Sequence, residues 1–122
     1  MQDGPRFASL PEPPYYAVVF SSQRSDRDET GYAATAQRMV ELARGQPGFL
    51  GYESARDAAG FGITVAYFES EEAIARWRDH PEHAAARREG HRSWYDHVEL
   101  RIALVQRAYR PIDAGAVPRG QP

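Results

Sequence analysis

Uncharged residues alternate through positions 61–68, and a segment with helical spacing follows them directly. Successive side chains of an extended strand point to opposite sides, so neither side of this strand carries a charge. One side would carry Phe61, Ile63, Val65 and Tyr67, and the other Gly62, Thr64, Ala66 and Phe68. Because neither side is suited to face water, the pattern predicts a sheet that is covered on both faces.

Three further strands follow from similar patterns. They cover residues 15–22, 49–56 and 95–109, and the strand described above covers residues 61–69. The last strand alternates between an apolar side and a mixed one. Its apolar side carries Val98, Leu100, Ile102 and Leu104. Gly60 should take a positive φ in the turn that joins the second strand to the third.

Helical spacing separates these strands. After the first strand, a helix starts at Asp28 or Thr30, and Gly45 is expected to end it in the left-handed conformation. Its apolar face consists of Tyr32, Ala36, Met39, Val40 and Ala43. Ser70 caps a second helix, which breaks near residues 79–80, and Pro81 begins another helical segment. The apolar stripe of this second helix is Ala73, Ile74 and Trp77.

The element order β-α-β-β-α-β predicts a ferredoxin-like α+β fold, whose four-stranded antiparallel sheet carries both helices on one face. We assign residues 15–110 to this domain, residues 1–14 to a flexible proline-rich arm and residues 111–122 to a flexible tail. The sheet face without helices is mostly apolar. At roughly 25 cal/mol per Å², leaving it in water would forfeit several kcal/mol. We therefore expect two sheets to pack face to face in a homodimer.

The composition excludes several classes of function. The chain has 122 residues and no cysteine, which removes disulfides, thiolate metal sites and cysteine nucleophiles. All 15 basic residues are arginine, so Schiff-base chemistry on lysine is ruled out. A formal net charge of −2 gives no general attraction for nucleic acid. No apolar run approaches the roughly 20 residues that span a membrane. We expect a cytoplasmic protein with neither nucleic acid nor membrane as a partner.

Trp77 is the first residue that could carry chemistry. It could simply anchor its helix to the sheet, or it could form the wall of a pocket that stacks on a flat aromatic molecule. Arg87 could face solvent, or it could hold an acidic or phenolic group at the mouth of that pocket. Three other aromatic residues are candidates: Tyr52, Tyr67 and Trp94. Each could be part of the core, or it could bind the substrate.

The four histidines are His80, His83, His91 and His97. The spacing of His80 and His83 could place two imidazoles on one side of a helix. A metal site would need a third ligand, such as Glu82 or Glu99, and no matching motif is present. We therefore expect no metal and no other cofactor. His83 or His91 could instead accept a proton from a substrate.

Four stretches of the chain form a distinctive set: Pro47–Tyr52 (PGFLGY), Ile63–Tyr67, Phe68–Trp77 (FESEEAIARW) and His80–His83 (HPEH). Together they resemble the antibiotic biosynthesis monooxygenase (ABM) family. The similarity covers about residues 15–110. It implies a dimeric α/β barrel of ferredoxin-like subunits, with Trp77 at the position of a pocket tryptophan. The family includes enzymes that oxidise aromatic polyketide intermediates without metal or flavin, haem-degrading enzymes, and proteins with no known activity.

This chain departs from that family pattern at two positions. Haem-degrading relatives have a histidine ten residues after the tryptophan, where this chain has Arg87. They also have an asparagine on the first strand, where residues 19–22 read VFSS. These differences argue against haem degradation. The missing asparagine also removes half of the asparagine–tryptophan pair that is associated with polyketide oxidation.

Two functions fit these residues. The first is a cofactor-independent monooxygenase that acts on a small quinol-like or anthrone-like aromatic. Trp77 would stack on it, Arg87 would favour its anion, and His83 or His91 would take its proton. The second is a non-catalytic dimer that binds a small molecule or is associated with stress. One tryptophan and one arginine near a pocket would serve either function.

Overall fold

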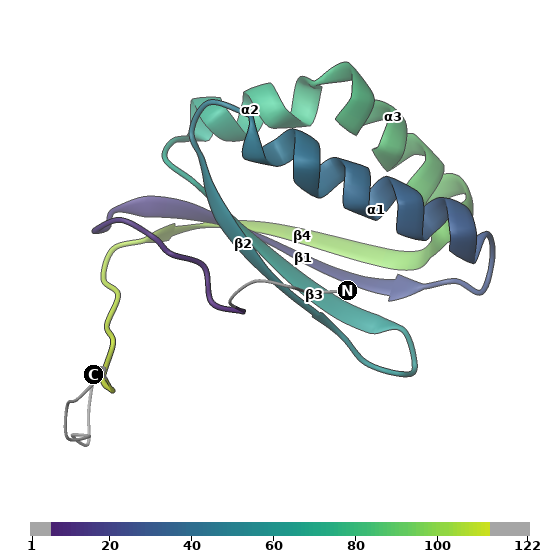
Figure 1. Ribbon diagram of the computed structural model, residues 1–122, viewed down its shortest axis with the longest axis horizontal. Helices are drawn as coiled ribbons and strands as arrows, with labels where there is room; N and C mark the ends of the chain where they lie inside the picture. The colour runs from purple at the N-terminus through teal and green to yellow at the C-terminus, as the bar shows by residue number, and fades with distance from the viewer. Residues whose placement is uncertain (1–5, 113–122) are drawn as a thin grey trace.

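The computed structural model describes residues 6–112, which form a four-stranded antiparallel sheet with helices on one face (Figure 1). In chain order, the first elements are β1 (Tyr15–Arg24), α1 (Glu29–Arg44), β2 (Phe49–Arg56) and β3 (Phe61–Phe68). They are followed by α2 (Glu71–Asp79), α3 (Pro81–Glu89), the π-helix η1 (Gly90–Trp94) and β4 (Tyr95–Val105). The sheet order is β2-β3-β1-β4. The ferredoxin-like α+β fold is confirmed, and the helical segment before β4 is divided at His80.

The predicted helix starts are confirmed by their side-chain caps. Asp28 accepts a hydrogen bond from the Gly31 amide at the start of α1, and Ser70 accepts one from the Ala73 amide at the start of α2. His80 separates α2 from α3. Its Nδ1 accepts a hydrogen bond from the Glu82 amide in the first turn of α3. The first residue of α3 is Pro81, which has no amide hydrogen that needs a partner.

Two expectations about the ends of elements are wrong. Gly45 ends α1 with φ −91°, and the positive φ of 85° belongs to Gly48. Gly48 is required there because a Cβ atom would lie 2.5 Å from the Cβ of Ala73. β4 ends at Val105 rather than at residue 109, because Val105 pairs with Tyr15, where β1 begins. The positive φ of Gly60 is confirmed.

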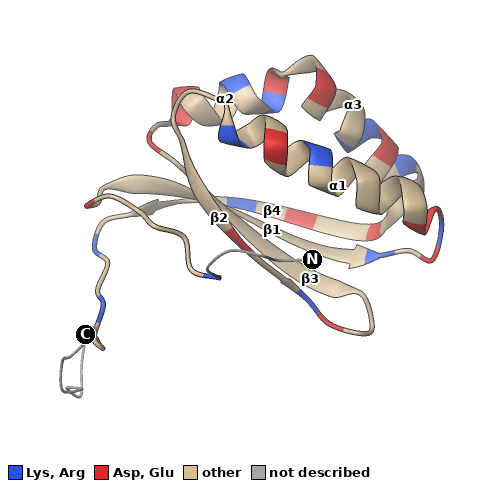
Figure 2. Cartoon of the chain, in the orientation of Figure 1, with Lys and Arg blue, Asp and Glu red and all other residues tan. Residues whose placement is uncertain are grey.

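The two faces of the sheet differ in burial. Phe68 points toward the helices and is 1% exposed, whereas Phe61 and Ile63 point the other way and are 47% and 42% exposed. Ala73 of α2 is buried on the helix side. Figure 2 shows that most charged positions lie on the helices and few on the sheet. The face without helices, called the open face below, therefore exposes apolar side chains in one copy of the chain.

Residues 6–14 contact the sheet, which the sequence did not indicate. The Ala8 amide donates to Glu53 Oε2 of β2 over 3.0 Å. In Figure 1 this segment runs back beneath the sheet, on the side opposite the helices. The tail predicted for residues 111–122 lies almost wholly outside the described residues, which end at 112.

Candidate functional site

Trp77 and His83 stack face to face where α2 meets α3. Their ring centroids are 4.1 Å apart and their planes differ by 10°. The helix break at His80 and Pro81 bends the chain between α2 and α3, so the first turn of α3 directly follows the last turn of α2 (Figure 1). Both rings are partly buried. The junction therefore holds a preformed pair of flat rings.

A hydrogen bond determines which nitrogen of His83 can accept a proton. Nδ1 lies 2.9 Å from the carbonyl oxygen of Trp77. A carbonyl oxygen can only accept, so in the neutral ring Nδ1 carries the hydrogen and Nε2 keeps its lone pair. Burial lowers the pKa of His83, and the charge of Arg87 lowers this pKa further, against the opposing effect of the bond to Trp77. His83 is therefore a neutral proton acceptor at pH 7, as a general base must be.

Arg87 lies near this pair, one helical turn beyond His83. Its Nη2 donates to the carbonyl oxygen of Arg78 over 2.9 Å, a bond that joins α3 to the end of α2. The side chain is exposed, and a guanidinium has five N–H donors, so further donors are available to an anion. The structure thus brings three of the predicted site residues together: Trp77, His83 and Arg87.

The other predicted site residues lie elsewhere. His91 is exposed in η1. Trp94 is buried in η1, and its indole N–H donates to Asp28 Oδ2 over 3.0 Å. Tyr52 lies on β2, where the guanidinium carbon of Arg44 is 5.9 Å from its ring centroid. Tyr67 points to the open face, as its bond to Glu53 Oε1 over 2.8 Å shows.

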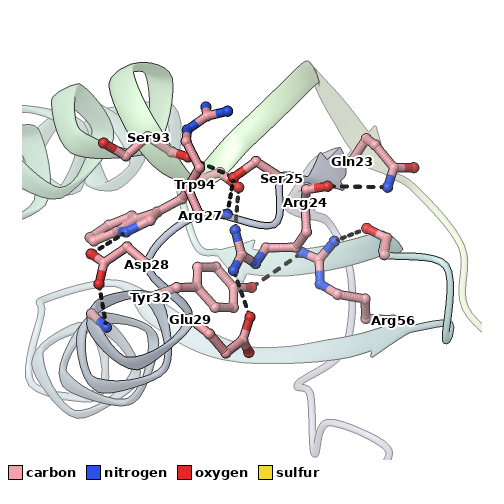
Figure 3. Close-up of polar contacts among 12 residues, drawn as sticks. Gln23, Arg24, Ser25, Arg27, Asp28, Glu29, Tyr32, Arg56, Ser93 and Trp94 are labelled. Atoms are coloured by element: carbon pink, nitrogen blue, oxygen red, sulfur yellow. Dashed lines mark hydrogen bonds and ion pairs between the residues drawn. The ribbon is translucent and has the colours of Figure 1, made fainter.

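A second polar cluster, which the sequence did not indicate, lies between β1, α1 and η1 (Figure 3). The buried guanidinium of Arg24 stacks 3.9 Å from the centre of the Tyr32 ring and pairs with Glu29 over 2.8 Å. It also donates to the carbonyl oxygen of Trp94. Arg56 of β2 donates to Ser22 Oγ over 2.9 Å and to the hydroxyl of Tyr32 over 3.3 Å. We call these residues the Arg24–Arg56 cluster.

The Arg24–Arg56 cluster joins the end of β1 to α1, β2 and η1. The Ser25 amide donates to the Trp94 carbonyl oxygen over 2.8 Å, beside the bond from Arg24. Burial raises the pKa of Tyr95, whose ring lies near both Tyr32 and Arg56, so this phenol stays neutral. Because both guanidinium groups already bond to acceptors of the chain, the cluster acts as a structural clamp. The sequence pattern that could have indicated this cluster is the placement of Ser22 and Arg24 on the same side of β1.

An apolar stripe on the helix-facing side of β4 is left uncovered by the helices. Its exposed residues are Leu100, Ile102 and Leu104. Leu104 lies in register with Tyr16, which pairs with Phe68, and Phe68 leads into α2. The stripe therefore reaches the end of the sheet at which α2 begins.

Two of the open cavities formed by the described residues can be placed, and neither of these two borders Trp77. One, of about 340 Å³, lies on α3 and η1 and is lined by Ala85, Arg88, Glu89 and Arg92. The other, of about 300 Å³, lies on the open face and is lined by residues of β1, β3 and β4. Among residues 6–112, no group of three or more potential ligands is placed to hold a metal ion. No helix described there is long and apolar enough to cross a membrane.

Known proteins resemble this chain in sequence and in fold. An uncharacterized protein of Bacillus subtilis, YqjZ, is 58% identical over 100 residues, which cover 82% of this chain and 87% of that protein. SnoaB of Streptomyces nogalater, described as a cofactor-independent oxygenase, has a TM-score of 0.66 at 12% identity, over 79% of this chain and 97% of SnoaB. Rv0793 of Mycobacterium tuberculosis has a TM-score of 0.64 at 17% identity, over 81% and 96% of the two chains.

At these identities the two solved structures show the fold alone. The family model for antibiotic biosynthesis monooxygenase matches residues 14–89, which run from the start of β1 to the end of α3. This match covers more than half of the chain and includes Trp77, His83 and Arg87. The chain belongs to the antibiotic biosynthesis monooxygenase family.

Proposed function

We propose that this protein is a cofactor-independent monooxygenase that oxidises a small, electron-rich aromatic of the quinol or anthrone type. The observation that carries the proposal is the pairing of Trp77 with His83, a neutral imidazole whose Nε2 is free to accept a proton. Membership of the family supports oxygenase chemistry, and the fold is shared with SnoaB, a cofactor-independent oxygenase by description.

The reaction begins with proton transfer from the substrate to Nε2 of His83. The resulting carbanion or phenolate is electron-rich enough to pass one electron to O₂, and the two radicals then combine to form a carbon–oxygen bond. The peroxide anion takes the proton back from Nε2 of His83, and loss of water from the resulting hydroperoxide leaves a carbonyl group. For an anthrone, the CH₂ carbon and O₂ give C=O and H₂O, so one oxygen atom stays on the product and the other leaves as water.

The remaining residues bind and orient the substrate. Trp77 forms one wall of the site, and the exposed guanidinium of Arg87 stabilises the negative charge that the proton transfer creates. The uncovered stripe of β4 supplies an apolar surface on the helix side of the sheet, suited to the rings of the substrate. A substrate that lies on these apolar groups displaces water from them, which favours reaction of the anion with O₂ over its reprotonation.

The proposal includes a homodimer formed through the open face. Phe61 and Ile63 are exposed there in the single chain, and a second copy would remove them from water. The helix side, which holds Trp77 and His83, stays accessible in such a dimer. Each copy would therefore carry its own site.

Oxygen consumption tests the activity. Wild-type protein, mixed with anthrone and quinol substrates in an oxygen electrode cell, should consume O₂ and yield the corresponding carbonyl product. His83→Gln should reduce kcat by about 10²-fold or more, the range reported for loss of a general base. Trp77→Phe should raise KM more than it lowers kcat.

His91→Gln is the matched control, because His91 is exposed in η1 and is not part of the stacked pair. Arg88→Gln serves the same purpose for Arg87→Gln. Equal losses in His83→Gln and His91→Gln would contradict the proposed base. Tight binding of the aromatic without any turnover would favour the second function, a dimer that binds a small molecule and does not catalyse.

A further inference from the structure

The N-terminal segment, residues 6–14, is anchored on the open face of the sheet. Glu53 accepts two hydrogen bonds there, one from the Ala8 amide over 3.0 Å and one from the Tyr67 hydroxyl over 2.8 Å. Gly51 lies two residues before Glu53 on β2, and it too lies against residues 6–14. A Cβ atom on Gly51 would be 3.2 Å from Ala8 Cβ and 3.7 Å from Leu10 Cδ2. The segment is thus in contact with β2 through both polar and apolar atoms.

This segment covers one part of the open face and leaves another part free. Tyr15 and Ala17 point to the open face, yet they are only 4% and 6% exposed. No helix reaches that side of the sheet (Figure 1). Tyr67 covers part of the start of β1, because its ring packs edge-on against Tyr15, and residues 6–14 run beneath the sheet on this same side (Figure 1). Phe61 and Ile63, at the other end of β3, remain uncovered.

The free part of the open face is self-complementary in charge. Glu99 and Arg101 are two residues apart on the open side of β4, and Glu99 also pairs with His97. A two-fold axis that passes between these residues would place Glu99 of each copy opposite Arg101 of the other. These charges lie beside Phe61, in the cavity of about 300 Å³. A second copy is therefore an occupant that matches this surface in polarity and in charge.

Phe7 extends the apolar surface beyond the sheet. It directly precedes the anchored Ala8, and it is 84% exposed, the largest exposed fraction among the large apolar side chains of the described chain. In the single chain this ring stays in water next to the anchored Ala8. It would be buried if a second copy packed against that face.

We propose that residues 6–14 form an intersubunit clasp: Glu53 fixes the segment on its own sheet, and the segment presents Phe7 to a second copy. This inference rests on the homodimer included in the proposed function. It adds that the interface is bounded on the β2 side by the N-terminal segment. The partner consequently contacts the free part of the open face and Phe7 together.

Three variants of the full chain test the clasp by sedimentation equilibrium. Phe7→Asp should raise the dimer dissociation constant by about tenfold or more, as loss of a buried aromatic anchor does. Glu53→Ala should have a similar effect, because it removes both acceptors. Glu53→Gln should be close to wild type, since its amide oxygen can accept from Ala8 while its NH₂ group donates to the Tyr67 oxygen. Ala85→Asp, on the exposed side of α3, is the matched surface control.

Hydrogen exchange supplies an independent readout of the anchor. The Ala8 amide should exchange more slowly than an unstructured amide in wild type and in Glu53→Gln, and at the unstructured rate in Glu53→Ala. A wild-type chain that is monomeric at micromolar concentration would overturn the dimer and the clasp with it. A stable dimer whose dissociation constant is unchanged by Phe7→Asp and Glu53→Ala would overturn the clasp alone. An unprotected Ala8 amide in the wild-type dimer would also overturn it.

Discussion

His83 and His91 have the same residue type and nearly the same place in the sequence, yet their surroundings give them different chemistry. His83 is stacked on Trp77 and bonded to a backbone carbonyl oxygen, and burial lowers its pKa. His91 is exposed on η1. The sequence identified both as proton acceptors but could not choose between them. The choice depends on the helix break at Pro81, which decides where the ring of residue 83 lies.

The lowered pKa of His83 gives the stability of the protein a defined pH dependence. An unfolded histidine binds a proton near pH 6.5, whereas the folded protein binds it at lower pH. Between these two values the unfolded state holds more protons, so the free energy of unfolding falls as the pH decreases below about 6.5. We expect His83→Gln to flatten this decline, as measured by urea denaturation between pH 5 and pH 8. His91→Gln should keep the wild-type slope, and an unchanged slope in His83→Gln would contradict the burial argument.

Tyr67 offers a spectroscopic measure of its surroundings on the open face. Burial, together with the carboxylate of Glu53, raises the pKa of Tyr67 to about 12. We expect the absorbance titration of wild type at alkaline pH to contain a component near this value that is missing in Tyr67→Phe. Glu53→Ala should move that component toward the ordinary pKa of tyrosine, about 10. A titration unaffected by Glu53→Ala would show that the Tyr67 hydroxyl does not bond to Glu53.

At the scale of elements, local signals were the most informative. The caps at Asp28 and Ser70 and the break at Pro81 were predictable, because each depends on residues adjacent in the chain. The end of α1 was not, since the positive φ falls on Gly48, where Ala73 of α2, distant in the sequence, packs too closely for any side chain. The Arg24–Arg56 cluster was missed for the same reason. Its members come from β1, α1, β2 and η1, and only the tertiary structure brings them together.

The two glycines after α1 should respond differently to alanine. Gly48→Ala forces a side chain into a φ of 85°, with its Cβ 2.5 Å from that of Ala73. We expect it to lower the free energy of unfolding by about 1–3 kcal/mol. Gly45 has a φ of −91°, and its Cβ would come no closer than 3.7 Å to Leu42 O. Gly45→Ala should therefore be neutral or stabilise by about 0.4–1 kcal/mol.

Chemical denaturation of the two variants checks this difference. A larger loss in Gly45→Ala than in Gly48→Ala would contradict the packing of α2 against the loop before β2. Such a result would support the original expectation that Gly45 supplies the left-handed residue.

At the scale of the whole molecule, the fold was predictable because alternating and helical spacing are strong in every element of the domain. The contact of residues 6–14 with the sheet was not predictable. That segment has no periodicity, and one of its anchors is a backbone amide, which every residue other than proline possesses. The grouping of the candidate site residues was predicted in part. Trp77, His83 and Arg87 lie together, whereas Tyr67 and Trp94 lie on the open face and in η1.

The open face provides a test of assembly. Ile63→Arg places a charge at the centre of the free apolar surface, where Ile63 is now exposed. We expect this variant to sediment as a monomer with an unchanged circular dichroism spectrum. Ala34→Arg, on the exposed side of α1, should leave the mass of the wild-type assembly unchanged. An Ile63→Arg protein that retains the wild-type mass would show that subunits do not meet through this face.

In the proposed reaction, His83 removes a proton from an aromatic substrate bound against Trp77. Anaerobic mixing of the protein with an anthrone isolates this step, because without O₂ the anion accumulates and its visible absorption can be recorded. Wild type should produce this absorption at a pH well below the pKa of the free anthrone. His83→Gln should bind the anthrone without producing it, and His91→Gln should behave as wild type. An anion band of equal size in His83→Gln, or none in wild type despite saturating binding, would show that His83 is not the base.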